Sequence, residues 1–186
     1  MTRMKKDFYA KTLLMLGLAG AVMGAAHAGY DVGDMPDTDS QIRNESDEMR
    51  ADHAQLLIQT LSEEFTEVRN LAAQQARFRQ MGDAESHEIA RMYGRWIDEH
   101  KAGVPALAHL IRQHGGDPET ATELKPPVLG TKEEMLRATH AAHVAAVRTS
   151  QARYGATSDW DIRWAMNQRA NLARKHIAEM NRRHDM

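Results

Sequence analysis

Histidine and methionine are the residues of this chain whose types and spacing could support chemistry. The sequence of 186 residues contains ten histidines and twelve methionines but no cysteine. His140 and His143 lie three residues apart, so on a helix both imidazoles would project from one face and could bind one ion. Imidazole is a common ligand of transition metals, and without cysteine any soft-metal site must be built from histidine and methionine.

Two methionine–histidine pairs are also spaced by about one helical turn. They are Met49/His53 and Met180/His184. Thioether sulfur together with imidazole nitrogen is a ligand set that suits copper, especially Cu(I). We therefore expect a metal site, with copper as the first choice of ion. The alternative is that the methionines fill the core and the histidines are hydrogen-bonded core residues.

The elements that would position these residues are helices. Apolar residues recur at helical spacing in four stretches, and strand-like alternation is absent from the sequence. The predicted helices cover residues 39–80, 83–114, 131–154 and 158–184. A break near Ser62 would divide the first of them, and Thr131 with Glu134 forms a capping box at the start of the third. The predicted fold is all-α, an antiparallel four-helix bundle of up-down-up-down order over residues 39–186.

Every predicted helix carries histidine on its apolar face. The rise per residue of a helix gives the level of each side chain along the bundle, and these levels divide the residues into two candidate sites. The central site is expected around His100, His140, His143 and Glu64, and the end site around His53, Met135, His176 and Met180. His87 and His109 lie off the apolar faces and are expected to be solvated.

The first 28 residues are typical of a signal peptide. Basic residues precede an apolar stretch at 13–26, and Ala26-His27-Ala28 predicts cleavage before Gly29. Residues 29–38 then form a flexible leader rich in Gly, Asp and Pro. We expect a periplasmic or otherwise exported protein without a permanent membrane span, and a retained N-terminal anchor is the alternative.

The charge and the motifs of the chain argue against several classes of function. Residues 1–28 hold four basic residues and one acid, so 20 of the 24 basic and 25 of the 26 acidic residues remain, a net charge of −5. This acidic balance argues against a nucleic-acid partner. The sequence contains no Glu-x-x-His pair of the di-iron bundles, no His-Glu-x-x-His, no phosphate loop and no Gly-x-Ser-x-Gly elbow. These observations favour a binding protein over an enzyme.

The last two predicted helices resemble the periplasmic ferritin-like family known as domain of unknown function 305. The resemblance covers about residues 131–184. The residues on which it rests are Met135-Leu136, His140, His143, Ala146-Val147, Asp161-Ile162-Arg163 and His176-Ile177-Ala178-Glu179-Met180. The segment from Ile97 to Pro118 also looks like related exported bundles. The resemblance implies a ferritin-like fold and copper binding through Met135, His140, His143 and Met180.

The sequence thus leads to one main hypothesis and two alternatives. The main one is a copper-binding periplasmic bundle that buffers, carries or confers tolerance to the metal. The second is a non-catalytic envelope module, with an envelope protein or a second copy of the chain as partner, whose histidines are structural or sense pH. The third is a metal-dependent oxidase or peroxidase, which would need an open coordination position.

Overall fold

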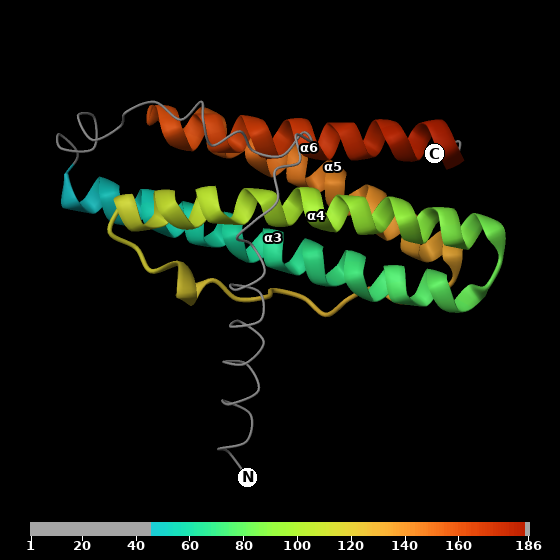
Figure 1. Ribbon diagram of the computed structural model, residues 1–186. Helices are drawn as coiled ribbons and strands as arrows, with labels where there is room; N and C mark the ends of the chain where they lie inside the picture. Colours follow the sequence, from blue (N-terminus) through green and yellow to red (C-terminus); the bar gives the residue numbers. More distant parts are fainter. Residues whose placement is uncertain (1–45, 185–186) are drawn as a thin grey trace, which may run out of the picture.

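The computed structural model describes residues 46–184, which form an all-helical bundle (Figure 1). Its four long helices are α3 (Asp47–Met81), α4 (Ala84–Gln113), α5 (Lys132–Ala156) and α6 (Trp160–His184), and a short 3-10 helix, η2 (Pro118–Thr120), follows α4. This part of the chain contains no strand, which confirms the predicted class. The signal peptide and leader predicted for residues 1–38 lie outside the described residues. None of the helices in the described range is long and apolar enough to cross a membrane.

Local chemistry explains where the helices begin and end. Ser46 and Asp83 accept hydrogen bonds from the first turns of α3 and α4, and Gly82 ends α3 at φ 77°, a conformation that glycine adopts readily. The capping box of Thr131 and Glu134 is present as predicted. No break occurs at Ser62: α3 continues through this residue, whose hydroxyl donates to the carbonyl of Ile58 one turn earlier.

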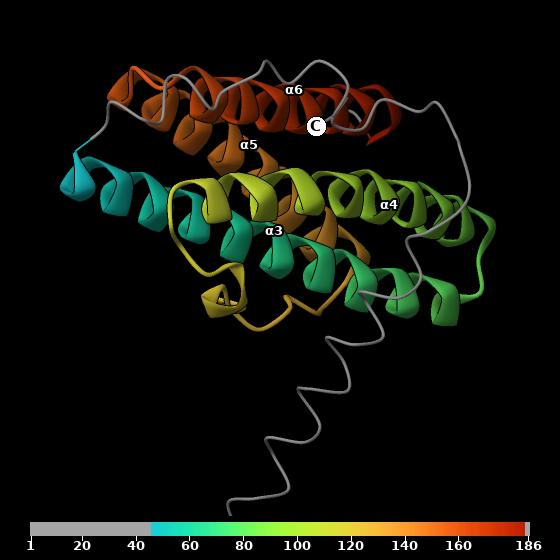
Figure 2. The same cartoon turned by 60° about the vertical axis from the view of Figure 1, so that its left-hand side comes forward.

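The order of the helices differs from the predicted up-down-up-down arrangement. After α4 the chain does not turn back directly but runs along α3 toward the α3–α4 turn, where α5 begins (Figures 1 and 2). Lys132 Nζ lies 2.7 Å from Glu85 Oε2 at that end. Consequently α4 and α5 point in the same direction and the order is up-down-down-up. The packed pairs α3/α4, α5/α6, α4/α6 and α3/α5 are all antiparallel.

A ladder of polar side chains on α3 fixes this long crossover. Ser62 Oγ, Thr66 Oγ1 and Asn70 Oδ1 accept from the backbone N–H groups of the crossover at 3.1, 2.8 and 2.8 Å. The three residues are spaced by four, so they line one face of α3. These bonds satisfy backbone donors that a loop lying against a helix would otherwise leave unpaired, and this is why the connection follows α3.

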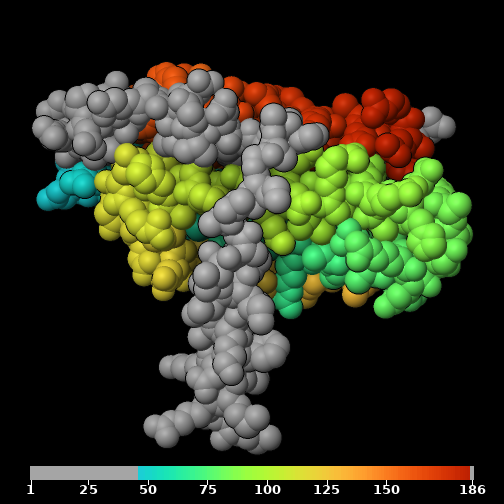
Figure 3. Space-filling model, viewed as in Figure 1, coloured from blue at the N-terminus to red at the C-terminus, as the bar shows by residue number. Residues whose placement is uncertain are grey.

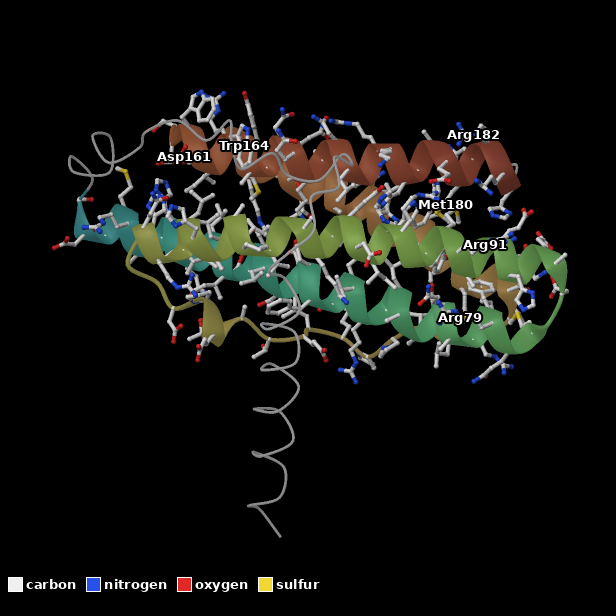
Figure 4. The ribbon with its side chains drawn as sticks, viewed as in Figure 1. Arg79, Arg91, Asp161, Trp164, Met180 and Arg182 are labelled. Atoms are coloured by element: carbon white, nitrogen blue, oxygen red, sulfur yellow. The ribbon has the colours of Figure 1, made fainter. Side chains whose placement is uncertain are left out.

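The core consists of two apolar clusters separated by a polar layer. The first lies near the α3–α4 turn around Phe78, Tyr93, Trp96, Met135 and Met180, and we call it the aromatic cluster. The second lies toward the other end and contains Leu57, Leu61, Leu107, Leu110, Ile111, Ile162 and Met166. In Figure 4, Met180 lies between α6 and α4 whereas Arg182 points away from the bundle, and Figure 3 shows α4 and α6 packed along one face.

The buried Gln74 side chain offers a test of this architecture. Its amide donates to the carbonyl of Val128 at 2.9 Å, and its carbonyl accepts from Thr139 Oγ1 at 2.7 Å, so one residue joins α3, the crossover and α5. We expect Gln74→Ala to lower the free energy of unfolding by about 1–3 kcal/mol, because both partners lose their hydrogen bonds. Urea denaturation measures this effect. The exposed Gln80→Ala on the same helix is the control, and an equal change in both variants would contradict the role of Gln74.

Candidate metal centre

Three histidines from three helices meet in the polar layer between the apolar clusters. His100 comes from α4, His143 from α5 and His176 from α6, and all three are buried. Their ring centroids are 4.8–5.8 Å apart. One ring nitrogen from each lies within 4.8 Å of the others, which is close enough for all three to bind one ion. We call these three residues the tri-histidine cluster.

The outer ring nitrogens of His100 and His143 are held by oxygen acceptors. His100 Nδ1 lies 2.8 Å from Glu64 Oε2, and His143 Nδ1 lies 3.0 Å from the carbonyl oxygen of Thr139. A carbonyl and a carboxylate can only accept, so each of these nitrogens carries the proton. This fixes both tautomers and leaves the Nε2 atoms facing inward.

His176 is held in the same way but with its ring reversed. Its Nε2 lies 2.8 Å from Glu99 Oε2, and Lys175 Nζ donates to the other oxygen of Glu99 at 2.7 Å. His176 Nε2 is therefore the donor, and Nδ1 faces inward. Second-shell carboxylates and carbonyls of this kind orient the histidine ligands of metal sites.

The inward nitrogens of His143 and His176 lie in a contact that a cation would satisfy. His143 Nε2 and His176 Nδ1 are 2.9 Å apart, but each ring has already donated its one proton outward. Two lone pairs thus face each other. His100 Nε2 has no hydrogen-bond partner among the described residues. An ion between the three nitrogens would satisfy all of them at once.

Glu67 supplies a candidate fourth ligand. Its Oε1 lies 3.7 Å from His143 Nε2, which is too far for a hydrogen bond, and this oxygen has no hydrogen-bond partner in residues 46–184. Burial, reinforced by the charge of Glu64, raises the pKa of Glu67. A nearby divalent ion would favour its ionised form. The resulting set of three imidazoles and one carboxylate is typical of transition-metal sites.

Buried charges set the electrostatics of the cluster. Glu64 accepts from His100 and, at 2.6 Å, from Arg169 Nε. Burial opposes its ionisation, but His100 and Arg169 outweigh burial and lower the pKa of Glu64 to about 2. Burial also lowers the pKa of His100, yet Glu64 outweighs it, so that this pKa is raised.

The other two histidines are kept neutral. Burial, together with the charge on His100, lowers the pKa of His143 to about 3. Burial and His143 likewise lower the pKa of His176. The cluster therefore accommodates one positive charge, which a proton on His100 supplies without metal and a metal ion can replace with release of that proton.

Trp96 closes the cluster on the side of the aromatic cluster. Its ring stacks on His176 with centroids 4.4 Å apart and an interplanar angle of 19°, and its Nε1 donates to Glu179 Oε2 at 3.0 Å. This contact fixes the plane of the His176 ring and keeps water from it.

The structure regroups the residues of the two predicted sites. His100, His143 and Glu64 come together as expected, and His176 joins them instead of the end site. His140 is half-buried and lines a hollow of about 560 Å³ on the outside of α5. Met135 and Met180 belong to the aromatic cluster, whereas His53 lies at the opposite end of the bundle beside His114.

The reversed direction of α5 is the reason for this regrouping. With the predicted order, the start of α5 would lie beside the start of α3, and Met135 would be level with His53. The crossover moves Met135 to the other end. The Met49/His53 pair is not a buried unit either, because Met49 is 46% exposed.

Two residues of the centre were missed by sequence reasoning. They are Glu99 and Arg169, both buried and both hydrogen-bonded to other residues of the layer. The signal for Arg169 was present, since this charged residue lies on the same helical face as Met166, Ala173 and His176. A charge on an otherwise apolar face indicates a buried partner of opposite charge.

A comparison with protein-family models, curated proteins and solved structures found no match to this chain. The resemblance to the ferritin-like family and the ligand set that it implies stay predictions.

The buried Glu64 gives a second prediction. Substitution Glu64→Gln removes the buried carboxylate shared by His100 and Arg169 and leaves Arg169 paired with the less buried Glu63 at 3.0 Å. Breaking this buried charge network should cost the metal-free protein about 3 kcal/mol of its free energy of unfolding. Urea denaturation measures the loss. Glu133→Gln, which removes an exposed carboxylate paired with Arg137, should have little effect. A Glu64→Gln variant as stable as this control would contradict the charge network.

Stability should also depend on pH in a defined direction. The pKa of His143 is about 3 against an ordinary 6.5, so its contribution to stability is full above pH 6.5 and is lost as the pH falls toward 3. Glu64, with a pKa of about 2 against 4.5, adds a further loss below pH 4.5. The raised pKa of His100 acts oppositely, because its contribution is full below pH 6.5 and falls as the pH rises.

We therefore expect the metal-free protein to unfold at lower urea concentration as the pH drops below about 6.5. His143→Gln should make the decline between pH 6.5 and 4.5 less steep, while His176, which is also held neutral, keeps part of it. Glu64 does not yet contribute in this range. The same pH dependence in the unmodified protein and in His143→Gln would show that His143 is not held neutral.

Proposed function

We propose that this protein is a metal-binding four-helix bundle that holds a transition-metal ion in the tri-histidine cluster, with copper as first choice. One observation carries the proposal. The inward nitrogens of His143 and His176 lie 2.9 Å apart, while their outer nitrogens lie within hydrogen-bond distance of the Thr139 carbonyl and of Glu99. The protein would buffer, carry or confer tolerance to the ion.

The donor set guides the choice of metal. Three imidazoles with Glu67 nearby suit Cu(II) and Zn(II), and for one set of ligands Cu(II) binds more tightly than the other divalent first-row ions. The thioethers of Met135 and Met180 belong to the neighbouring aromatic cluster. We therefore propose an imidazole-rich site instead of the methionine–histidine pairs that the sequence favours.

The enclosure of the cluster supports holding an ion over catalysis. His143 and His176 have no exposed surface, and His100 is 4% exposed. Turnover requires a coordination position that a substrate can reach. Tight burial instead slows the exchange of a bound ion, which is useful for storage and tolerance.

A ferritin-like fold and export to the periplasm complete the proposal. One long crossover between two antiparallel hairpins is the arrangement of ferritin-like bundles, and it supports the predicted resemblance. The signal-like sequence of residues 1–28 supports export.

Titration of the purified metal-free protein with Cu(II) and Zn(II) tests the proposal. We expect the double variant His143→Ala/His176→Ala to weaken binding at the tri-histidine cluster by at least 100-fold. Glu99→Gln, which replaces the charged acceptor behind His176 with a neutral amide, should weaken it by about 10- to 100-fold. Calorimetry in buffers of different ionisation enthalpy should also detect proton release on binding.

The matched control is His87→Ala/His109→Ala, which removes two exposed histidines of α4. Binding that changes equally in the control and in the His143/His176 variant would assign the metal to surface histidines and refute the proposal.

The second candidate is a structural or pH-sensing role for the same histidines. It is favoured by the ion pairs of Glu64 with His100 and Arg169, which satisfy one another without metal. This role predicts that Cu(II) and Zn(II) leave the melting temperature unchanged at pH 7. A stabilisation by either ion that is lost in His143→Ala/His176→Ala would exclude it.

A further inference from the structure

A second group of possible metal ligands lies at the end of the bundle opposite the aromatic cluster. It consists of His53 from α3, His114 at the end of α4 and Asp159 just before α6, and we call it the cap cluster. All three residues are at most 9% exposed. One ligand atom from each lies within 4.8 Å of the other two.

The separations within the cap cluster fit an ion. His114 Nε2 and Asp159 Oδ2 are 3.9 Å apart, which is too long for a hydrogen bond. Two ligands that each bind one ion at about 2.0–2.2 Å lie at up to about 4 Å from each other. The rings of His53 and His114 meet edge-on with centroids 5.2 Å apart, so the two imidazoles lie beside the same point.

Neighbouring groups orient two of the three ligands. Thr157 Oγ1 lies 3.0 Å from His53 Nε2 and also accepts from the backbone N–H of Asp159 at 3.0 Å. Asp159 uses Oδ1 to accept from the N–H of Ile162 at 2.9 Å, as the cap of α6. Its Oδ2 is the oxygen turned to His114. Second-shell support of this kind positions metal ligands before the ion binds.

The surroundings give the cap cluster access and a favourable field. A surface hollow of about 460 Å³ reaches His114 and is also lined by Asp47 and Gly115. His114 is the C-terminal cap of α4, where the helix dipole favours positive charge. An ion can thus reach this end of the bundle from solvent, in contrast to the enclosed tri-histidine cluster.

We infer that the cap cluster is a second metal site, which binds a divalent transition ion such as Zn²⁺ through two imidazoles and one carboxylate. Two histidines and one carboxylate are a known set of protein ligands for zinc. The bound ion would tie α3, α4 and the start of α6 together at the end of the bundle where no short turn joins α4 to α5. The site shares no residue with the tri-histidine cluster, so either can exist without the other.

Zinc titration of the metal-free protein tests this inference, with Asp159→Asn as the main variant. The asparagine oxygen can still cap α6, so the fold should be kept while the anionic ligand is lost. We expect two Zn²⁺ per chain in the unmodified protein and one in Asp159→Asn, with a smaller rise in melting temperature on zinc addition. His53→Gln is the second variant and should lose the same ion. His109→Gln, an exposed histidine of α4, should bind as the unmodified protein does.

The outcomes separate the two sites. A zinc ion that persists in His143→Ala/His176→Ala but is lost when Asp159→Asn is added belongs to the cap cluster, whatever happens at the tri-histidine cluster. Equal stoichiometry and affinity in the unmodified protein, Asp159→Asn and His53→Gln would overturn the inference.

Discussion

The carboxylate of Glu64 is the constraint around which the bundle is arranged. A buried charge is costly unless it is paired and hydrogen-bonded, and Glu64 meets this requirement by using one oxygen for His100 and the other for Arg169. Arg169 also lies 3.3 Å from Ser150 on α5. One charge therefore links all four helices. A shift of α3, α4 or α6 by one turn would break at least one of the two bonds of Glu64. The polar layer therefore sets a register that the two apolar clusters alone would not define.

This register gives the histidines their chemical character. Glu64, Glu99 and the carbonyl of Thr139 each take the outer proton of one imidazole, and the rings turn their other nitrogens toward a common centre. Burial, together with the charge on His100, lowers the pKa of His143, whereas Glu64 outweighs burial at His100 and raises its pKa, so the proton resides on His100. Metal binding, in this account, replaces that proton with an ion that all three rings can share.

The sequence patterns predicted those features of the fold that interactions between nearby residues determine. The ends of α3 and α5 follow from Gly82 and from the pairing of Thr131 with Glu134, which act within a few residues. The direction of α5 depends instead on hydrogen bonds between Ser62, Thr66 and Asn70 and a crossover about 60 residues away. Hydrophobic periodicity carries no information on such bonds, so the up-down-up-down order was wrong.

The candidate site was likewise predictable only for residues whose level in the bundle does not depend on the direction of α5. His100 and His143 were placed together because each lies at mid-height whichever way α5 runs, whereas the grouping of His53 with Met135 depended on that direction. X-ray absorption of the Cu(II)-loaded Asp159→Asn variant, at one Cu(II) per chain, shows whether the tri-histidine cluster holds the metal, since this variant lacks the carboxylate of the cap cluster. We expect three imidazole nitrogens and one oxygen at about 2.0–2.2 Å from the copper. A first shell containing sulfur, or only oxygen without imidazole, would contradict it.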